Sequence, residues 1–183
     1  NEGLICTSAC LAGEINQYAA QNDYGGAKKA ALEYMEIFPE RFYLEIQNHN
    51  IPEELSTHST IKKLSQELNI PLVATNDCHY ALEEHWEAHD ILFCLGTDKN
   101  RDDQNRLRYE PRQFYIKSTD TMFALFKDTP RALENTLKIA ESCDLEIPMG
   151  EYHLPTFPIP GGDESENGDM FLRRICLSGL RKR

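Results

Sequence analysis

The sequence lacks the features that define several large protein classes. No stretch approaches the 18 or more apolar residues of a membrane-spanning helix, and the first ten residues, NEGLICTSAC, have no basic region ahead of a long apolar segment. The phosphate-binding patterns G-x-x-x-x-G-K-[ST] and G-x-G-x-x-G and the nucleophile pattern G-x-S-x-G do not occur. We therefore expect a cytoplasmic protein with no membrane partner, and neither a common nucleotide-binding fold nor a serine hydrolase.

Basic residues are also in short supply. The 183 residues include 19 Lys and Arg against 30 Asp and Glu, which gives a formal net charge of −11. Such a surface repels phosphate backbones, because binding driven by counterion release needs clustered Lys and Arg. If the protein works on nucleic acid, we expect its main contacts to lie elsewhere than in this chain.

The cysteines form neither a disulfide framework nor a zinc finger. They are widely and irregularly spaced, and only the first two are close together, as C-x3-C, without a second pair to complete a four-ligand site. We expect free thiols, most of them small core residues, at Cys6, Cys10, Cys78, Cys94, Cys143 and Cys176.

The first half of the chain alternates between strand and helix patterns. Apolar segments with strand character lie at 3–6, 42–47 and 70–75. A helical stripe follows each of them, formed by Ala27, Ala31, Tyr34 and Phe38, by Ile61, Leu64 and Leu68, and by Ala88, Ile91, Leu92 and Leu95. Strands separated by helices predict an α/β fold with parallel pairing and right-handed crossovers.

The second half is predicted to leave that sheet. We expect an exposed loop at 98–109, a helix with Thr129 as N-cap and Leu133, Leu137 and Ala140 facing inward, and a Pro- and Gly-rich linker at 154–169 before a last amphipathic helix. The predicted domains are 1–153 and, as linker and helix, 154–183. Three βα units are too few to close an eight-stranded barrel, so the sequence predicts a truncated, open sheet.

The segment VATNDCHY, residues 73–80, carries the strongest candidate site. Asp77 and His79 are two positions apart at the end of a predicted strand, where parallel α/β folds bind ligands, and could share one metal ion. The alternative is that Asp77 caps a turn or helix while His79 is a hydrogen-bonded, half-buried histidine.

Other candidates follow the same logic. A thiolate at Cys10, a few residues after the first strand, would face the same end of the sheet, although an inert buried cysteine is the alternative. His49 follows the second strand, and we expect it beside the ligands or the substrate instead of among the ligands. The pair His85 and His89 has helical spacing for zinc but lacks the glutamate of an H-E-x-x-H site, so an ordinary amphipathic helix is favoured.

Five blocks in order, GLICTSACLAGEI, FYLEIQNHNIPEE, PLVATNDCHY, EAHDILFCLGT and EYHLPTFPIP, carry a resemblance to a known family. The chain resembles the alpha subunits of bacterial DNA polymerase III, in the later part of their N-terminal polymerase-and-histidinol-phosphatase (PHP) domain. That resemblance implies a distorted α/β barrel, here partial, with a cluster of metal ions at its strand ends.

The resemblance also assigns residues. It places metal ligands at Cys10, Asp77 and His79, with Ala9 where the family often has glycine. The ion would be zinc, manganese or magnesium, and we expect it to bind weakly or not at all here, because the family's H-x-H motif and its next ligands would lie upstream of Asn1. No residue of this chain is expected to catalyse polymerisation, since the polymerase aspartates would lie beyond Arg183.

The implied function is that of a fragment of a replicative DNA-directed DNA polymerase, a nucleotidyltransferase, with metal-dependent 3′-5′ exonuclease proofreading in the PHP domain. Its implied partners are DNA, deoxynucleotides, a proofreading exonuclease subunit and a sliding clamp. Two alternatives stay open: a non-catalytic PHP module that docks the proofreading subunit, and a free-standing PHP phosphoesterase.

Overall fold

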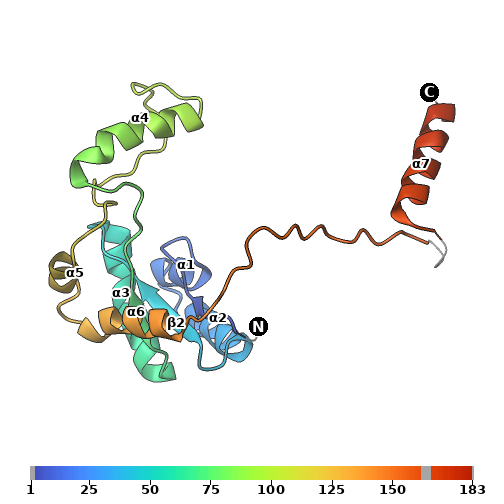
Figure 1. Cartoon of the computed structure of the whole chain (residues 1–183). Helices are drawn as coiled ribbons and strands as arrows, with labels where there is room; N and C mark the ends of the chain where they lie inside the picture. The colour runs from blue at the N-terminus through green and yellow to red at the C-terminus, as the bar shows by residue number, and fades with distance from the viewer. Residues whose placement is uncertain (1–2, 162–165, 183) are drawn as a thin grey trace. The chain divides into compact units, whose positions relative to one another are not determined.

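Three parallel strands form the sheet among the residues that the computed structural model describes, which are 3–161 and 166–182 (Figure 1). Their order is β1 (Cys6–Thr7), β2 (Phe42–Ile46) and β3 (Leu72–Ala74), with β2 in the middle. Both pairs are parallel, as predicted from the alternation with helices. The sheet is not closed into a barrel, which agrees with the predicted partial α/β fold.

Strand β1 begins later than the sequence pattern predicted. The prediction placed it at 3–6, whereas Leu4 is 59% exposed and pairing begins at Cys6, which lies opposite Phe42 in the register. The reason is geometric, because Gly3 has a φ of +77° and lies in a turn, so the backbone only becomes extended beyond it.

Helices connect the strands and cover the core. The helices α1 (Glu14–Ala20) and α2 (Tyr24–Ile37) lie between β1 and β2, and α3 (Pro52–Leu68) lies between β2 and β3. Ala27 and Ala31 of α2 and Ile61 and Leu64 of α3 are fully buried together with Leu44 of β2, so the predicted stripes face the core. Each such branched side chain contributes roughly 1.5–3 kcal/mol on burial.

Residues 83–112 form an excursion that leaves the sheet and returns to it. The excursion closes at a parallel bridge between Tyr80 and Tyr115, where the backbone N–H of His79 also donates to the carbonyl oxygen of Phe114 at 2.8 Å. It contains the 3-10 helix η1 (Glu83–His85), the helix α4 (Trp86–Gly96) and the predicted loop at 98–109.

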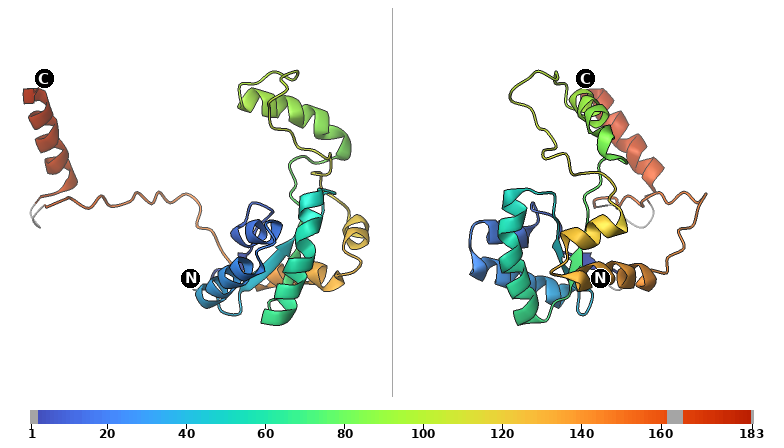
Figure 2. Two further views of the ribbon diagram at one scale, coloured as in Figure 1. Left: turned by 180° about the vertical axis from the view of Figure 1, so that it is seen from behind. Right: turned by 90° about the vertical axis from the view of Figure 1, so that its left-hand side faces the viewer.

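Helix α4 lies away from the three strands in both Figure 1 and Figure 2. Its predicted apolar stripe is consequently open to solvent, with Ile91, Leu92 and Leu95 exposed at 46%, 65% and 74%. The element was predicted correctly, but its leucines do not enter the core of this chain.

Helix α6 (Pro130–Ser142), which follows the short helix α5 (Thr119–Leu125), buries only part of the face that was predicted. The prediction that Leu133, Leu137 and Ala140 face inward is right for Leu133, which packs against the core. It is wrong for Leu137, which is 62% exposed, and for Ala140, which is exposed too. The buried residues are Ala132 and Asn135, because α6 lies along the edge strand β3, where a small side chain permits close approach and an amide satisfies a free carbonyl.

The second unit, Leu145–Arg183, is described by itself. Its described part consists of an extended segment and the helix α7 (Gly168–Lys182), and residues 162–165 of the predicted linker lie outside the described residues. The first unit ends at Asp144, ahead of the domain boundary expected at 153/154. Of the helices in the described ranges, none is long and apolar enough to span a membrane.

Candidate functional site

A buried carboxylate lies where the three strands end. Glu45 of β2 is 9% exposed, and its carboxylate accepts hydrogen bonds from Thr7 Oγ1 at 2.6 Å, from Gln47 Nε2 at 3.0 Å and from the hydroxyl of Thr75. Thr7 is the last residue of β1, and Thr75 comes directly after β3. Side chains from β1, from β2 and from the residue after β3 therefore meet at the carboxyl edge of the sheet, the edge at which parallel α/β folds bind ligands.

The loop that carries Cys10 is held in a tight conformation. Ala9 has a φ of +60°, in the left-handed region that favours glycine. A Cβ atom on Gly13 would lie 2.2 Å from the carbonyl oxygen of Ser8, so only glycine fits there. The amide of buried Asn16 donates to the carbonyl oxygens of Ala9 and Cys10 at 3.3 and 3.1 Å, which fixes the backbone of Cys10 relative to α1.

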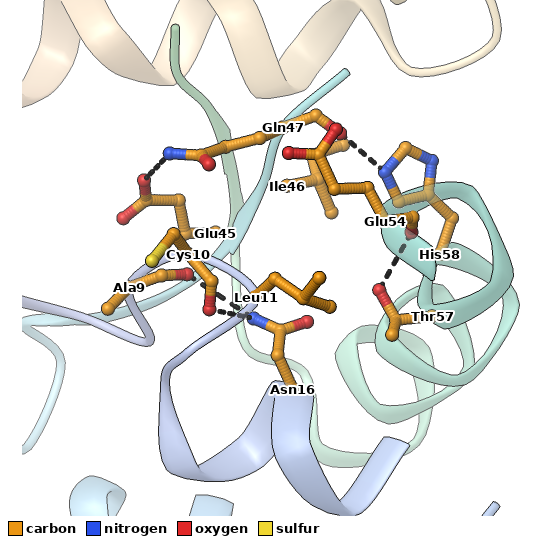
Figure 3. Close-up of a pocket in the computed structure, with 10 residues that line it drawn as sticks. All are labelled: Ala9, Cys10, Leu11, Asn16, Glu45, Ile46, Gln47, Glu54, Thr57 and His58. Atoms are coloured by element: carbon orange, nitrogen blue, oxygen red, sulfur yellow. Dashed lines mark hydrogen bonds between the residues drawn. The ribbon is translucent and has the colours of Figure 1, made fainter. Parts of the chain in front are cut away.

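The cavity beside Cys10 is small. Figure 3 shows it between the Cys10 loop, β2 and α3, with Glu45, Glu54 and His58 among its walls. Its volume of about 10 Å³ is close to the minimum for one water molecule. Burial lowers the pKa of His58, whose Nε2 donates to the carbonyl oxygen of Gln47 at 2.8 Å. The cavity walls thus include a thiol, two carboxylates and an imidazole.

Asp77 and His79 lie next to each other beyond β3. His79 Nε2 is 3.1 Å from Asp77 Oδ2. The side chain of His79 is 29% exposed and that of Asp77 is 43% exposed. Neither residue caps a helix, since η1 begins at Glu83 and has Leu82 at its N-cap. A carboxylate and an imidazole in contact and open to solvent form a pair of donors that zinc or manganese accepts.

His49 connects the end of β2 to this pair. Its ring is buried, with Nδ1 2.8 Å from Glu54 Oε1, and its backbone N–H donates to Glu54 Oε2 at 2.8 Å. The backbone N–H of Asp77 donates to His49 Nε2 at 3.3 Å. An imidazole that accepts at Nε2 carries its proton at Nδ1 and donates it to Glu54. His49 thus lies beside the predicted ligands and fixes the backbone of one.

Glu54 is held as a carboxylate by this contact. Burial alone would raise its pKa, but the hydrogen bonds from the ring and the backbone of His49 outweigh burial, and the pKa lies below its ordinary value. The His49 ring also stacks on Phe114, with the ring centroids 4.5 Å apart. The segment after β3 is therefore supported by the hydrogen-bonded pair of His49 and Glu54 on one side and by the ring of Phe114 on the other.

The described residues do not bring Cys10 into a cluster with Asp77 and His79. Within 3–161 and 166–182, no three His, Cys, Asp or Glu side chains gather closely enough to hold a metal ion. His85 is exposed and lies in η1, directly ahead of α4, which carries the half-buried His89. The His89 ring lies instead 5.8 Å from that of His79, and burial lowers its pKa.

Comparison with known proteins identifies the chain. Residues 1–49 match the PHP domain family, and that match ends at His49. The whole chain aligns with DNA polymerase III subunit alpha of Campylobacter jejuni at 38% identity, of Borreliella burgdorferi at 42% and of Thermus aquaticus at 34%. Over its whole length the chain is similar to DNA polymerase III alpha subunits. It spans 17%, 16% and 15% of the lengths of these three relatives.

The alpha subunit match decides one of the open alternatives. It extends over 100% of the chain, so the linker and α7 match the same relatives as the sheet. A free-standing phosphoesterase is therefore not supported. The predicted resemblance to alpha subunits is confirmed, and the partial PHP fold agrees with the open parallel sheet.

Two acidic residues of this alpha subunit segment were missed by the sequence reasoning. Glu45 and Glu54 are both buried, and each makes several hydrogen bonds at the carboxyl edge of the sheet. Glu45 could have been found, because it lies between two buried apolar residues of a strand, where an acid is unfavourable unless it is paired. Glu54 gave no such signal, since an acid in the first turn of a helix is ordinary.

Proposed function

We propose that the chain is a segment of a replicative DNA-directed DNA polymerase, and that its sheet edge contributes to a divalent-metal site acting on DNA ends. The observation that carries the proposal is the alignment of the entire chain, at 34–42% identity, with DNA polymerase III alpha subunits. Nucleotidyl transfer, the DNA and deoxynucleotide substrates, and contacts with a proofreading exonuclease and a sliding clamp would be properties of the longer protein.

The proposed ligands from this chain are Asp77, His79 and Cys10. Asp77 and His79 fit a divalent ion as a pair, with an oxygen donor and a nitrogen donor in contact and partly open to solvent. Cys10 does not cluster with them among the described residues, and two clustered donors are too few for a stable site. Further ligands would therefore come from elsewhere in the longer protein. A bound ion would neutralise phosphate charge and activate water for 3′-5′ hydrolysis.

His49 and Glu54 are proposed as positioning residues. The backbone N–H of Asp77 is fixed by the His49 ring, which is fixed in turn by Glu54. A ligand whose backbone is held in this way loses less conformational freedom when it binds an ion, which is why such supporting contacts affect metal affinity strongly. His49 thus acts on the site through Asp77 and touches no substrate itself.

The test is metal content in the longer polymerase that contains this chain. Asp77→Asn and His79→Ala should lower bound zinc or manganese, measured by mass spectrometry after dialysis, and should reduce 3′-5′ exonuclease activity while primer extension continues. His85→Ala is the matched control, an exposed histidine that should leave both readouts unchanged. Wild-type metal content in both site variants would remove the ligand assignment.

His49→Ala separates positioning from ligation. We expect a tenfold or larger rise in the metal dissociation constant, in line with the 10- to 100-fold losses that follow removal of supporting contacts. The variant should still bind metal at high concentration, whereas His79→Ala should not regain full occupancy. Equal affinities of wild type and His49→Ala would show that the buried pair only stabilises the fold.

A non-catalytic docking role is the second candidate, and it is favoured by one observation. No metal cluster is complete among the described residues, so a module that keeps the fold without the ion is consistent with the geometry. In that case the longer polymerase would bind its proofreading subunit equally well after metal removal with EDTA, and it would have no exonuclease activity of its own. Purified polymerase with and without metal distinguishes the two roles.

A further inference from the structure

A cavity between α4 and the following loop is lined by four arginines. It has a volume of about 290 Å³, close to the lower limit of roughly 300 Å³ for ligand pockets. Four of the 19 basic residues line it, namely Arg101, Arg106, Arg108 and Arg112. Asp90, Asp102 and Glu110 also line the cavity, so its lining carries a formal net charge of +1 in a chain whose formal net charge is −11.

Two of these arginines hold the loop on the helix. Arg106 makes a two-pronged ion pair with Asp90 of α4, with distances of 2.6 and 2.7 Å, and its side chain is only 4% exposed. Arg101 pairs with Glu87 of the same helix at 2.5 Å. Their charges are neutralised by these contacts, so they shape the cavity and do not bind a ligand.

The other two arginines have donors to spare. Within the described part of the chain, Arg108 donates to the carbonyl oxygens of Arg101 and Asp103 at 3.4 and 3.2 Å and has no carboxylate as an ion-pair partner. Arg112 is 50% exposed, and its nearest carboxylate, on Glu110, is 3.8 Å away. A guanidinium with unused N–H groups at a cavity wall is suited to phosphate.

Aromatic side chains supply the second part of a nucleotide contact. The guanidinium carbon of Arg112 lies 3.3 Å from the ring centroid of Trp86, so the two planes form a stack, and Tyr80 and Tyr109 also line the cavity. Unpaired bases stack on aromatic rings and on arginine planes, and phosphates of the same strand reach neighbouring guanidinium groups. A duplex does not offer free base faces, so this arrangement favours a single strand.

We infer that this cavity binds single-stranded nucleic acid, with Arg108 and Arg112 on phosphates and the Arg112–Trp86 stack as a platform for a base. The inference rests on the proposed function only because a segment of a DNA polymerase is expected to lie near DNA. It requires no metal ion. Tyr109 also contacts His79, with ring centroids 4.1 Å apart, so a strand bound here would pass beside the Asp77 and His79 pair.

The single tryptophan of the chain gives a direct measurement. Oligothymidylate is titrated into the 183-residue chain in EDTA, and Trp86 fluorescence is followed together with the anisotropy of a labelled oligonucleotide. We expect saturable quenching of Trp86. Arg108→Ala and Arg112→Ala should each weaken binding about fivefold or more, and Arg108→Ala should reduce the slope of log K against log salt by about 0.7, the value for one phosphate contact on a single strand.

Arg131→Ala is the matched control, an exposed arginine on α6 that should bind like wild type. Circular dichroism shows whether each variant is folded. If Arg108→Ala does not fold, the binding measurement on Arg112→Ala tests the inference. Three results would overturn the inference: no quenching of Trp86 at low salt, equal losses in Arg131→Ala and Arg108→Ala, or equally tight binding of an acidic peptide of the same charge. Because EDTA removes metal, a failed metal assignment leaves this outcome unaffected.

Discussion

At the scale of single residues, the Cys10 loop depends on one required glycine and one strained alanine. Gly13→Ala would place a Cβ atom 2.2 Å from a backbone oxygen, and backbone cannot move away as a side-chain end can. We predict a loss of at least about 2 kcal/mol in the free energy of unfolding, near the middle of the range for overpacking. Urea unfolding of the chain measures this loss.

Ala9→Gly is the opposite change in the same loop. Ala9 is held at a φ of +60°, which costs an L-residue roughly 1–2 kcal/mol and costs glycine little. Glycine also makes the unfolded chain more flexible, which offsets about half of that gain. We therefore predict that Ala9→Gly is neutral or slightly stabilising. A loss as large as that of Gly13→Ala would contradict the left-handed conformation.

The pKa of His58 predicts a pH dependence of stability. Burial, assisted by the charge of Lys62 and opposed by Glu54 and the hydrogen bond to Gln47, holds the pKa of His58 below 6.5 in the folded chain. Below pH 6.5 the unfolded chain therefore binds a proton that the folded chain does not, and stability falls as the pH falls. The slope cannot exceed about 1.4 kcal/mol per pH unit for one proton.

The measurement is urea unfolding between pH 7.5 and 5.5. His58→Gln keeps a hydrogen-bond donor without a titrating group, so its stability should depend less on pH in this window than that of the wild type. His153→Gln is the control, since the His153 side chain is 76% exposed. The same pH profile in wild type and His58→Gln would show that another group is responsible.

At the scale of elements, an amide hydrogen bond joins α6 to the sheet. Asn135 is 8% exposed, and its Nδ2 donates to the carbonyl oxygen of Leu72 in the edge strand β3 at 2.7 Å. Asn135→Ala would leave that carbonyl without a partner, at a cost of about 1–3 kcal/mol. Thr136→Ala, an exposed change in the next position, should cost far less in the same unfolding measurement.

The elements were more predictable than their orientation. The alternation of apolar strands and helical stripes was enough to predict the parallel sheet. The partners that bury these stripes lie within this chain, since Leu44, Ile61 and Leu64 pack in one core cluster. The buried face of α6 was not predictable. A leucine stripe predicts a buried face only if a partner covers it, and here Ala132 and Asn135 contact the strand edge while Leu137 stays exposed.

The candidate site was predictable in part for a related reason. Asp77 and His79 are close in sequence, so the spacing of two residues was sufficient to place them together. The support from His49 and Glu54 depends on how α3 returns to the strand end, which no local pattern encodes. The short helix α1 was missed as well, because seven residues with two alanines give too little periodicity to detect.

At the scale of the whole molecule, the two units differ in how much apolar surface they bury. The buried cluster of the first unit is made entirely of residues ahead of Asp144. In the second unit the apolar side chains are open to solvent, with Leu145, Met149 and Leu154 exposed at 81–87%. The chain spans only about a sixth of the length of its relatives.

This difference in burial predicts how truncation changes stability. A chain that ends at Asp144 retains every residue of the buried cluster, so its urea midpoint should match that of the 183-residue chain within experimental error. Limited proteolysis of the full chain should cut first within the exposed segment 145–161, because extended backbone without secondary structure fits a protease. As a control, a chain that ends at Leu125 loses α6 and should unfold at markedly lower urea. A drop of more than about 1 kcal/mol on truncation at Asp144 would show that stability of the first unit depends on residues 145–183.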